Sequence, residues 1–385
     1  MSYDLLVKGG FVIDPAQGIE EEMDVAISNG RIAEVAKSIS NAKKVIDASE
    51  KVVVPGLIDL HTHLYKYVTL WGVDADADCL GKGVTTAVDA GSSGCLNYEG
   101  FRKLIVDQVQ TRVLTFLHIS SVGLTPPFHV GELQDFRNLD FEKALETVKE
   151  NRGNILGIKI RLGKTIVNEY GPQALRLAKE VAKGAGVPLM VHPGVLPENL
   201  PFVDVLKVLE KGDIVTHCLP PPYPPTLPYT MLFDEKDEVL QEVWKAIKRG
   251  IIFDVGHGAG SFSFQTAEKA IKQGLLPATI STDLHTYSIK YPVYDLPTTL
   301  SKFLHLGLTL PQVIERCTAK AAQVLGLDGK IGTLKPGAEG DVTILKMIKG
   351  KFEFWDVVKN SRIGERLLKT ITVIKGGRII KKDAY

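Results

Sequence analysis

The stretch PGLIDLHTH at residues 55–63 carries the strongest signal in this chain of 385 residues. An apolar run that favours a strand ends in His61-Thr62-His63. Side chains at positions i and i+2 lie on the same side of a strand, so both imidazoles can reach one metal ion at its C-terminal end. An HxH pair also arises by chance, and its place at the end of an apolar strand favours a ligand pair.

Seven further strand-like runs follow this one along the chain. The eight runs are residues 56–60, 84–89, 113–118, 155–161, 187–192, 213–217, 251–255 and 278–283. Helix-like runs lie between several of them, at residues 141–150, 173–183, 238–248 and 265–272. Alternating strands and helices predict a parallel sheet, and eight units in about 270 residues predict an α/β fold of the closed (β/α)8 TIM barrel type.

An open, doubly wound sheet is the alternative fold. Such a sheet usually carries a glycine-rich phosphate turn after its first strand, and no such turn follows residues 56–60. The glycine-rich run GHGAGSFSF at residues 256–264 follows the seventh strand, so it does not indicate a nucleotide loop. The barrel is therefore the favoured fold.

Both ends of the chain are rich in short β-type runs. They are residues 4–13, 24–27, 31–35 and 51–54 at the start, and 341–345, 369–374 and 378–380 at the end. Asn29-Gly30 and Gly376-Gly377 are typical of tight turns. We predict a small composite β-sandwich domain from residues 1–54 and 328–385, beside a (β/α)8 barrel domain of residues 55–327. Two unrelated caps are the alternative.

Composition and charge narrow the class of protein. Hydrophobic residues make up 44% and charged residues 24% of the chain, which is typical of a globular protein. The formal net charge of +1 gives no reason to expect nucleic acid as a partner. A small-molecule substrate is the expected partner, and a homo-oligomer remains open.

The sequence also predicts a cytoplasmic location. The four cysteines are widely spaced and form no CxxC pair, as expected for free thiols in a reducing compartment. The first residues do not have the pattern of a signal peptide, because acidic and basic residues interrupt the apolar run that such a peptide needs. No uncharged apolar run reaches the roughly 18 residues that a membrane span needs.

Polar side chains end five of the predicted strands. Besides His61 and His63 they are Lys159, Arg161, His192, His217 and Asp283. In a barrel the C-terminal ends of all strands meet on one face, which is where active sites of this fold lie. Any one of these histidines could be a core residue, but the agreement of five strand ends predicts a site for two divalent metal ions.

Lys159 is unusual among these residues. A lysine in a barrel mouth is costly to keep as an ammonium, so burial lowers its pKa. The neutral amine can add CO2 to form a carbamate, N6-carboxylysine, whose oxygens can bridge two metals. An ion pair with Asp283 or a cation that binds substrate is the alternative role.

Four residues are candidates for substrate binding. The guanidinium of Arg161 suits a carboxylate, although an internal salt bridge is an equal alternative. His257 follows the seventh strand and could donate a hydrogen bond to the substrate or support the site from behind. Ser92 follows the second strand and could shape the pocket floor, and His285 lies two residues beyond Asp283 and could orient it.

Several segments together resemble the amidohydrolase superfamily. They are VKGGFVIDP (7–15), VVPGLIDLHTHL (53–64), the strand ends KIR, VH, TH and STDLH, and IGTLKPGAEGDVTIL (331–345). DAGSSG (89–94) and DVGHGAGSFSF (254–264) look like the deacetylase branch, whose members hydrolyse acetylated hydroxy acids or N-acyl amino acids. The resemblance spans nearly the whole chain.

This resemblance implies roles for the strand-end residues. His61, His63 and Asp283 would hold one metal, His192 and His217 the other, and carboxylated Lys159 would bridge them. Zinc is the usual metal of the family. Asp283 would accept a proton as a hydroxide shared by the metals attacks the acyl carbon, and would then pass it to the leaving group.

This sequence differs from other branches of the superfamily at several site positions, and these differences help to choose between the possible activities. Dihydroorotases and hydantoinases often follow the last aspartate with His-Ala-Pro, whereas here it is followed by LHTY. Mononuclear base deaminases lack the bridging lysine, and D-aminoacylases use a cysteine in that role. We therefore expect a deacetylase that cleaves an acyl ester or amide of a small, anionic substrate, with a cyclic amidase as the alternative.

Overall fold

The computed structural model describes residues 2–126, 130–222 and 231–382. Its strands are β1 Leu5–Asp14, β2 Ile19–Ser28, β3 Arg31–Ala36, β4 Val45–Asp47, β5 Val52–Pro55, β6 Leu57–Thr62, β7 Val84–Gly94, β8 Arg112–His118, β9 Ile155–Arg161, β10 Leu189–His192, β11 Ile214–Val215, β12 Ile252–Phe253, β13 Val342–Trp355, β14 Ser361–Lys375 and β15 Arg378–Lys382. Its α-helices are α1 Tyr98–Phe101, α2 Phe141–Glu150, α3 Lys164–Val167, α4 Gly171–Ala185, α5 Phe202–Val208, α6 Gln241–Lys248, α7 Phe264–Lys272, α8 Leu296–His305, α9 Leu310–Arg316 and α10 Ala319–Val324.

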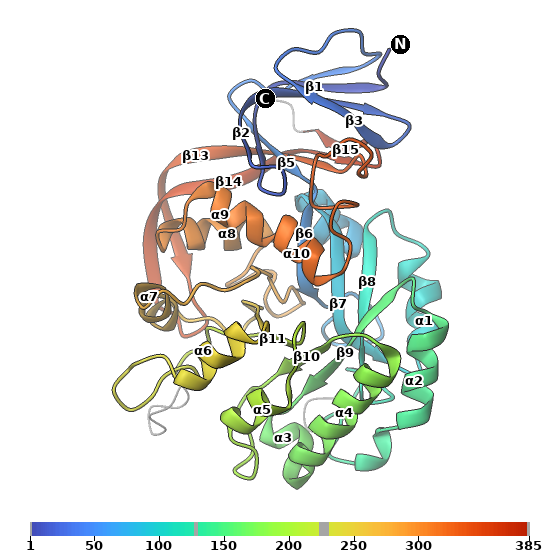
Figure 1. The fold of residues 1–385 in the computed structure, drawn as a ribbon, viewed down its shortest axis with the longest axis vertical. Helices are drawn as coiled ribbons and strands as arrows, with labels where there is room; N and C mark the ends of the chain where they lie inside the picture. The colour runs from blue at the N-terminus through green and yellow to red at the C-terminus, as the bar shows by residue number, and fades with distance from the viewer. Residues whose placement is uncertain (1, 127–129, 223–230, 383–385) are drawn as a thin grey trace.

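Strands β6 to β12 form a parallel, curled sheet in the order of the sequence. Helices lie on its outer side, and α4 packs against β9 and β10 (Figure 1). The strands are almost wholly buried, as expected for parallel strands covered on both faces. This arrangement is a TIM-barrel-like α/β fold, which confirms the predicted α/β class, and its sheet has seven regular strands among the described residues.

The eighth predicted strand, residues 278–283, is not a regular strand. Its segment forms one parallel bridge from Thr279 to Asp254, beside β12, and another from Leu284 to Thr62, at the end of β6. The segment therefore spans the gap between the last and the first strand. Asp283 has a φ of 49°, a left-handed conformation that turns the backbone out of an extended path and prevents a longer ladder.

Both ends of the chain contribute strands to a second sheet of eight strands. Its order is β15-β14-β13-β5-β1-β2-β3, and β4 pairs with β1 (Figure 1). A separate apolar cluster belongs to it, made of residues that include Leu5, Val7, Val25, Ile344 and Ile374. The shared sheet fits the predicted association of the two ends, while a two-layered sandwich stays a prediction.

The hairpin β13–β14 extends well beyond the predicted runs 341–345 and 369–374. Its outer part packs against α8 and buries Phe354 and Leu368 in the apolar cluster of the barrel. Lysines and a glycine interrupt the sequence of β13, so it lacks the regular hydrophobic pattern that would predict a strand of this length. The contact with α8 is tertiary and stabilises strands that the local pattern does not predict.

The start of one predicted helix is wrong. The structure begins α6 at Gln241 instead of residue 238, because Val239 forms an antiparallel bridge with Phe233 and Leu240 is extended. By contrast, α2 and β9 have the predicted bounds.

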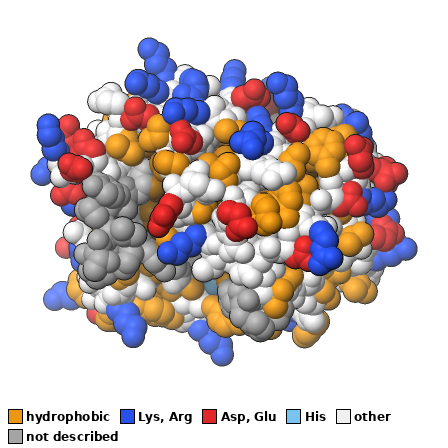
Figure 2. Space-filling model, turned by 90° about the horizontal axis from the view of Figure 1, so that it is seen from below, with side chains coloured by type: hydrophobic (Ala, Val, Ile, Leu, Met, Phe, Trp, Pro, Cys, Tyr) orange, Lys and Arg blue, Asp and Glu red, His pale blue; other side chains and the backbone are white. Residues whose placement is uncertain are grey.

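The surface carries charges of both signs. On the face in Figure 2, lysine and arginine side chains and aspartate and glutamate side chains are scattered among hydrophobic and other side chains. Within the described part of the chain, none of the helices combines the length and the apolar character needed to cross a bilayer. All four cysteines are buried and free, and the cytoplasmic location stays a prediction.

Candidate active site

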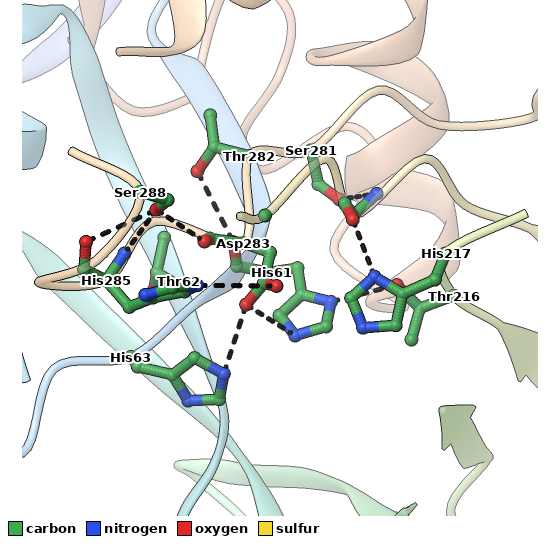
Figure 3. Close-up of polar contacts among 12 residues, drawn as sticks. His61, Thr62, His63, Thr216, His217, Ser281, Thr282, Asp283, His285 and Ser288 are labelled. Atoms are coloured by element: carbon green, nitrogen blue, oxygen red, sulfur yellow. Dashed lines mark hydrogen bonds and ion pairs between the residues drawn. The ribbon is translucent and has the colours of Figure 1, made fainter. Parts of the chain in front are cut away.

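Three of the predicted ligands converge on one point at the end of β6. The Oδ1 atom of Asp283 lies 3.3 Å from Nε2 of His61 and 3.2 Å from Nε2 of His63. Figure 3 shows both imidazoles and the carboxylate pointing toward one another. Because His61 and His63 project from the same side of β6, the spacing in the sequence becomes a shared ligand position.

The remaining strand-end residues lie next to this point. The Nζ atom of Lys159 is 3.2 Å from Nε2 of His61. The ring of His217 lies 5.0 Å from that of His61 and 4.2 Å from that of His192, measured between centroids. His61, His217 and Asp283 each offer a ligand atom within 4.8 Å of the other two. The structure thus brings together all six predicted ligands.

A pocket opens above these residues. Six of its lining residues are predicted site residues, and Trp71 and Leu124 complete the wall, so that the lining is His61, His63, Trp71, Leu124, Lys159, Arg161, His192 and Asp283. No sequence pattern marks Trp71 or Leu124 as a site residue. Both lie in loops after strands, where no periodic signal marks a residue that turns toward the site.

The hydrogen bonds of the histidines prepare Nε2 for a metal. Nδ1 of His217 lies 2.6 Å from the carbonyl oxygen of Gly256, which can only accept, so Nδ1 carries the proton. Nε2 of His217 is buried and has no hydrogen-bond partner. A buried, unprotonated ring nitrogen without a partner is costly unless it binds an ion. This donor set therefore fits a divalent metal.

Burial keeps these imidazoles neutral. It is the largest cause that lowers the pKa of His63 to about 3 and that of His217 to about 4, and it lowers the pKa of His61 well below its usual value. Metal binding requires the neutral imidazole, so the site does not need to release protons from these rings at neutral pH.

Lys159 is buried in the same way. Its amine contacts His61 and lies 3.5 Å from Sδ of Met190. Burial lowers the pKa of Lys159 to about 7, and the nearby guanidinium of Arg161 adds to this, against the opposite effect of Asp283. A substantial fraction of this lysine is thus a free amine at neutral pH, which carbamate formation requires.

Arg161 forms an internal salt bridge and also lines the pocket, so its position fits both of the roles predicted for it. Its NH1 atom donates to Oε1 of Glu132 at 2.6 Å, and its guanidinium lies over the ring of Trp71, 5.6 Å from the centroid. The same side chain lines the pocket. Glu132 was missed because it lies in the long connection after β8, 29 residues from Arg161 in the sequence.

Ser92 lies behind a candidate ligand instead of at the pocket floor, and the contacts of His257 fit the supporting role that was its predicted alternative. The hydroxyl of Ser92 lies 3.1 Å from Nδ1 of His63, so it supports a ligand from behind and is not part of the pocket lining. Both ring nitrogens of His257 are engaged, Nδ1 with the carbonyl of Gly258 at 2.9 Å and Nε2 with Nζ of Lys302 at 2.8 Å. Neither prediction of direct substrate contact is supported, because tertiary partners occupy these side chains.

His285 lies close to the group that it was predicted to orient. Its Nε2 is 3.9 Å from Oδ2 of Asp283, and its ring stacks edge-on against Trp71 at 4.8 Å. Burial lowers the pKa of His285 to about 4. A neutral His285 therefore lies between the carboxylate and the aromatic wall.

Two glycines after β12 make room for the convergence. A Cβ atom on Gly258 would come within 2.2 Å of Oδ2 of Asp283, and one on Gly256 within 2.3 Å of the hydroxyl of Thr216. Both glycines have a positive φ. The glycines of the run GHGAG (256–260) thus pack directly against the candidate ligands.

These features define a class of protein: a TIM-barrel-like enzyme with a metal-ligating donor set in the pocket at its mouth. A family model described as the amidohydrolase family matches residues 263–381. A deacetylase of Agrobacterium fabrum is 34% identical over 95% of this chain and 88% of its own length. Two crystal structures are also similar: an adenine deaminase with a TM-score of 0.90 and a dihydroorotase with 0.87.

Each of these crystal structures is 32% identical in sequence to this chain. The first alignment covers 98% of this chain and 99% of the deaminase, the second 99% of this chain and 98% of the dihydroorotase. This chain belongs to the amidohydrolase family. It is accordingly a hydrolase that acts on C–N bonds.

Proposed function

We propose that this protein is a binuclear metal-dependent deacetylase that cleaves the acyl amide or ester of a small carboxylate-bearing substrate. Acetylated hydroxy acids and N-acyl amino acids are the substrate classes. The observation that carries the proposal is the convergence of six ligand candidates: His61, His63, Lys159, His192 and Asp283 line the pocket, and the ring of His217 lies beside those of His61 and His192. The similarity to a deacetylase over 95% of the chain supports the reaction class.

In this proposal His61, His63 and Asp283 hold one ion, and His192 and His217 hold the other. Zinc suits a set dominated by imidazole and carboxylate ligands. Such ions polarise the acyl carbonyl and lower the pKa of water when they are bound.

Asp283 is the proposed general base and acid. Its Oδ1 atom lies between the two imidazoles of β6, and Oδ2 faces Gly258 and His285. The carboxylate takes a proton from the attacking water and delivers it to the nitrogen or oxygen of the leaving group. In this proposal His285, whose Nε2 lies 3.9 Å from Oδ2, helps to orient the carboxylate.

Lys159 is the proposed site of carboxylation. The neutral amine attacks CO2, a C–N bond forms, and one proton leaves, so that a cation is replaced by an anionic oxygen donor. The depressed pKa of Lys159 and its contact with His61 support this step. Protein grown with 13C-labelled bicarbonate should give one carbamate carbon signal per chain, and Lys159→Met should lack it; no signal in metal-loaded wild type would contradict the modification.

Arg161 is the proposed carboxylate-binding residue. Glu132 and Trp71 hold its guanidinium at the pocket wall, where its remaining N–H groups can donate to a substrate carboxylate. Arg161→Met should raise KM for N-acetyl amino acids far more than KM for their uncharged amides, since only the former offer a negative charge.

A cyclic amidase is the second candidate, because a dihydroorotase structure matches the chain with a TM-score of 0.87. The test is a substrate panel on zinc-loaded protein: N-acetyl amino acids, acetylated hydroxy acids, dihydroorotate and hydantoins, with adenine included because a deaminase structure also matches. Turnover of the acetylated acids alone is the expected result. Preferential opening of a cyclic amide would establish the second candidate.

We further propose that residues 1–54 and 328–385 form one β-sandwich domain and residues 55–327 the catalytic domain. The shared sheet of the two chain ends and its separate apolar cluster support this division.

A further inference from the structure

Asp254 is a buried carboxylate with no part in the proposed reaction. It lies directly after β12 and accepts hydrogen bonds from three hydroxyl groups. Thr216 donates to its Oδ2 at 2.8 Å, Thr279 to its Oδ1 at 2.7 Å, and Ser281 to both oxygens at 2.7 and 2.9 Å. Burial raises the pKa of Asp254, and these three hydroxyl donors oppose that effect.

One of these hydroxyls also contacts a candidate metal ligand. Oγ1 of Thr216 lies 2.8 Å from Nδ1 of His61. A hydroxyl has a single proton, and Thr216 gives it to Asp254, so its oxygen must accept from His61. Nδ1 of His61 therefore carries the ring proton, and the lone pair of Nε2 faces Asp283 and Lys159.

The side chains of this hydrogen-bond chain are shielded from solvent, so water cannot replace the bonds between them. His61 is 1% exposed, and Thr216 and Asp254 are fully buried. If the ring adopted the other tautomer, an N–H group would point into the ligand position and Nδ1 would lack a donor. Histidine ligands of metal sites commonly donate the N–H group of their second ring nitrogen to a carboxylate or another acceptor. Loss of that acceptor weakens metal binding.

We propose that Asp254, acting through the hydroxyl of Thr216, is a positioning residue that fixes the tautomer of His61 and strengthens metal binding. The inference rests on the metal centre of the proposed function and adds to it a buried relay of imidazole, hydroxyl and carboxylate. The same carboxylate also binds Thr279 and Ser281, so it holds β11, β12 and the segment of Asp283 in one arrangement.

A purely structural role for Asp254 makes a different prediction, and Thr279 offers the matched control. Thr216 and Thr279 are both fully buried, and each donates one hydroxyl bond of similar length to Asp254. Only Thr216 also contacts a candidate ligand. The isosteric variants Thr216→Val and Thr279→Val remove the same kind of bond, and only the first breaks the relay.

The experiment measures the zinc dissociation constant of the metal-free, full-length chain by competition with a chromophoric chelator. Thr216→Val should weaken zinc binding by about 10–100-fold relative to wild type. Thr279→Val and Thr216→Ser should remain within about threefold, since each keeps the hydroxyl that faces His61. Melting temperatures of the metal-free variants should fall for both valine substitutions, and further for Thr216→Val, because it also removes the acceptor of Nδ1 of His61.

Two results would overturn the relay: wild-type zinc affinity in Thr216→Val, or an equal loss of affinity in Thr279→Val. Thr216→Ala removes the same hydroxyl with less bulk and replaces the valine variant if the latter does not fold. Failure of the proposed function is distinguishable, because then wild type itself would bind less than one zinc ion per chain.

Discussion

The parallel sheet consists of two halves that are held together differently. Strands β6 to β9 have between 6 and 11 residues and pair through ladders that a few register shifts interrupt. Strands β10 to β12 have only four, two and two residues, and the segment 279–284 forms isolated bridges. In the first half, hydrogen bonds between strand backbones hold the sheet together. In the second half, hydrogen bonds to buried carboxylates add to the few backbone bonds.

Three aspartates connect the short half. Asp213 accepts from the backbone N–H groups of Leu189 and Glu210, and Asp254 binds the three hydroxyls described above. Asp59 on β6 accepts from the N–H and the hydroxyl of Thr282, across the gap that closes the barrel. A side-chain carboxylate can satisfy the donors of a strand that turns away, whereas a ladder requires an extended partner.

This difference explains where the strained ligands lie. His217 and Asp283, both in the short half, have positive φ angles of 60° and 49°. His61, Lys159 and His192 have no such strain, because they lie within regular strands, and His63 directly follows β6 without a positive φ. The short half thus gains freedom to aim its ligands, and the carboxylates hold them in that conformation.

The largest expected effect is on the strained carboxylate itself. Asp283→Asn removes the proposed proton acceptor but keeps the shape of the side chain, so turnover should fall by roughly 10²–10⁴-fold. Zinc content measured by mass spectrometry should decline far less than activity. A near-normal kcat would show that the short half supplies a ligand but no general base.

Removing the metal should affect the two halves of the parallel sheet to different extents. Ions present at 100–1000 times their dissociation constant stabilise a fold by roughly 2.7–4.1 kcal/mol. Dialysis against a chelator should therefore accelerate amide hydrogen exchange, mainly in residues 213–217, 251–258 and 279–285, where few ladder bonds remain. Strands β7 to β9 should stay protected, and an equal acceleration in both halves would contradict the comparison.

The glycine against Asp283 provides a third test. Gly258→Ala places a methyl group 2.2 Å from Oδ2 of Asp283 at a φ of 54°, so the carboxylate must move. A displacement of about 1 Å can cost roughly 10²-fold in rate. Gly260→Ala is the control, because its Cβ would meet open space two residues away. Equal kcat values in the two variants would mean that Asp283 tolerates displacement.

The smallest effect concerns the contact that supports the loop after β12. Nζ of Lys302 contacts Nε2 of His257 and the carbonyls of Pro292 and Trp355, each at 2.8 Å. Burial lowers the pKa of Lys302 to about 7, from 10.5. Between these two pH values the unfolded chain binds a proton that the folded chain lacks, so Lys302 should make stability rise with pH across this window.

Urea unfolding at about pH 7.5, 8.5 and 9.5, all within that window, measures this slope. Lys302→Met should flatten it, whereas Lys207→Met, at a lysine side chain that is 70% exposed, should leave it unchanged. The same slope in wild type and Lys302→Met would show that Lys302 stays charged when buried.

The sequence predicted the long half better than the short half. The bounds of β9 and α2 are confirmed, because both have full-length periodic patterns. The run 278–283 was predicted as a strand, yet its polar residues Thr279, Ser281 and Thr282 bind carboxylates instead of forming a ladder. A short β-rich run does not reveal whether its partner will be a backbone or a side chain.

Supporting residues were the least predictable part of the site. Glu132, Trp71 and Asp254 contact candidate site residues or their partners, but each is distant in sequence from the group that it supports. His257 and Ser92 carry suitable chemistry, and their partners Lys302 and His63 direct it away from the pocket.

The sequence by itself determined which chemical groups end the strands, and therefore that imidazoles, a lysine and a carboxylate gather at one rim. The reason is local: strand periodicity fixes the side of each residue, and parallel strands align their ends. Only the tertiary structure decided that Thr216 links His61 to Asp254 and that Glu132 holds Arg161. Those contacts join segments that meet only when the barrel closes, and no local pattern encodes their distance.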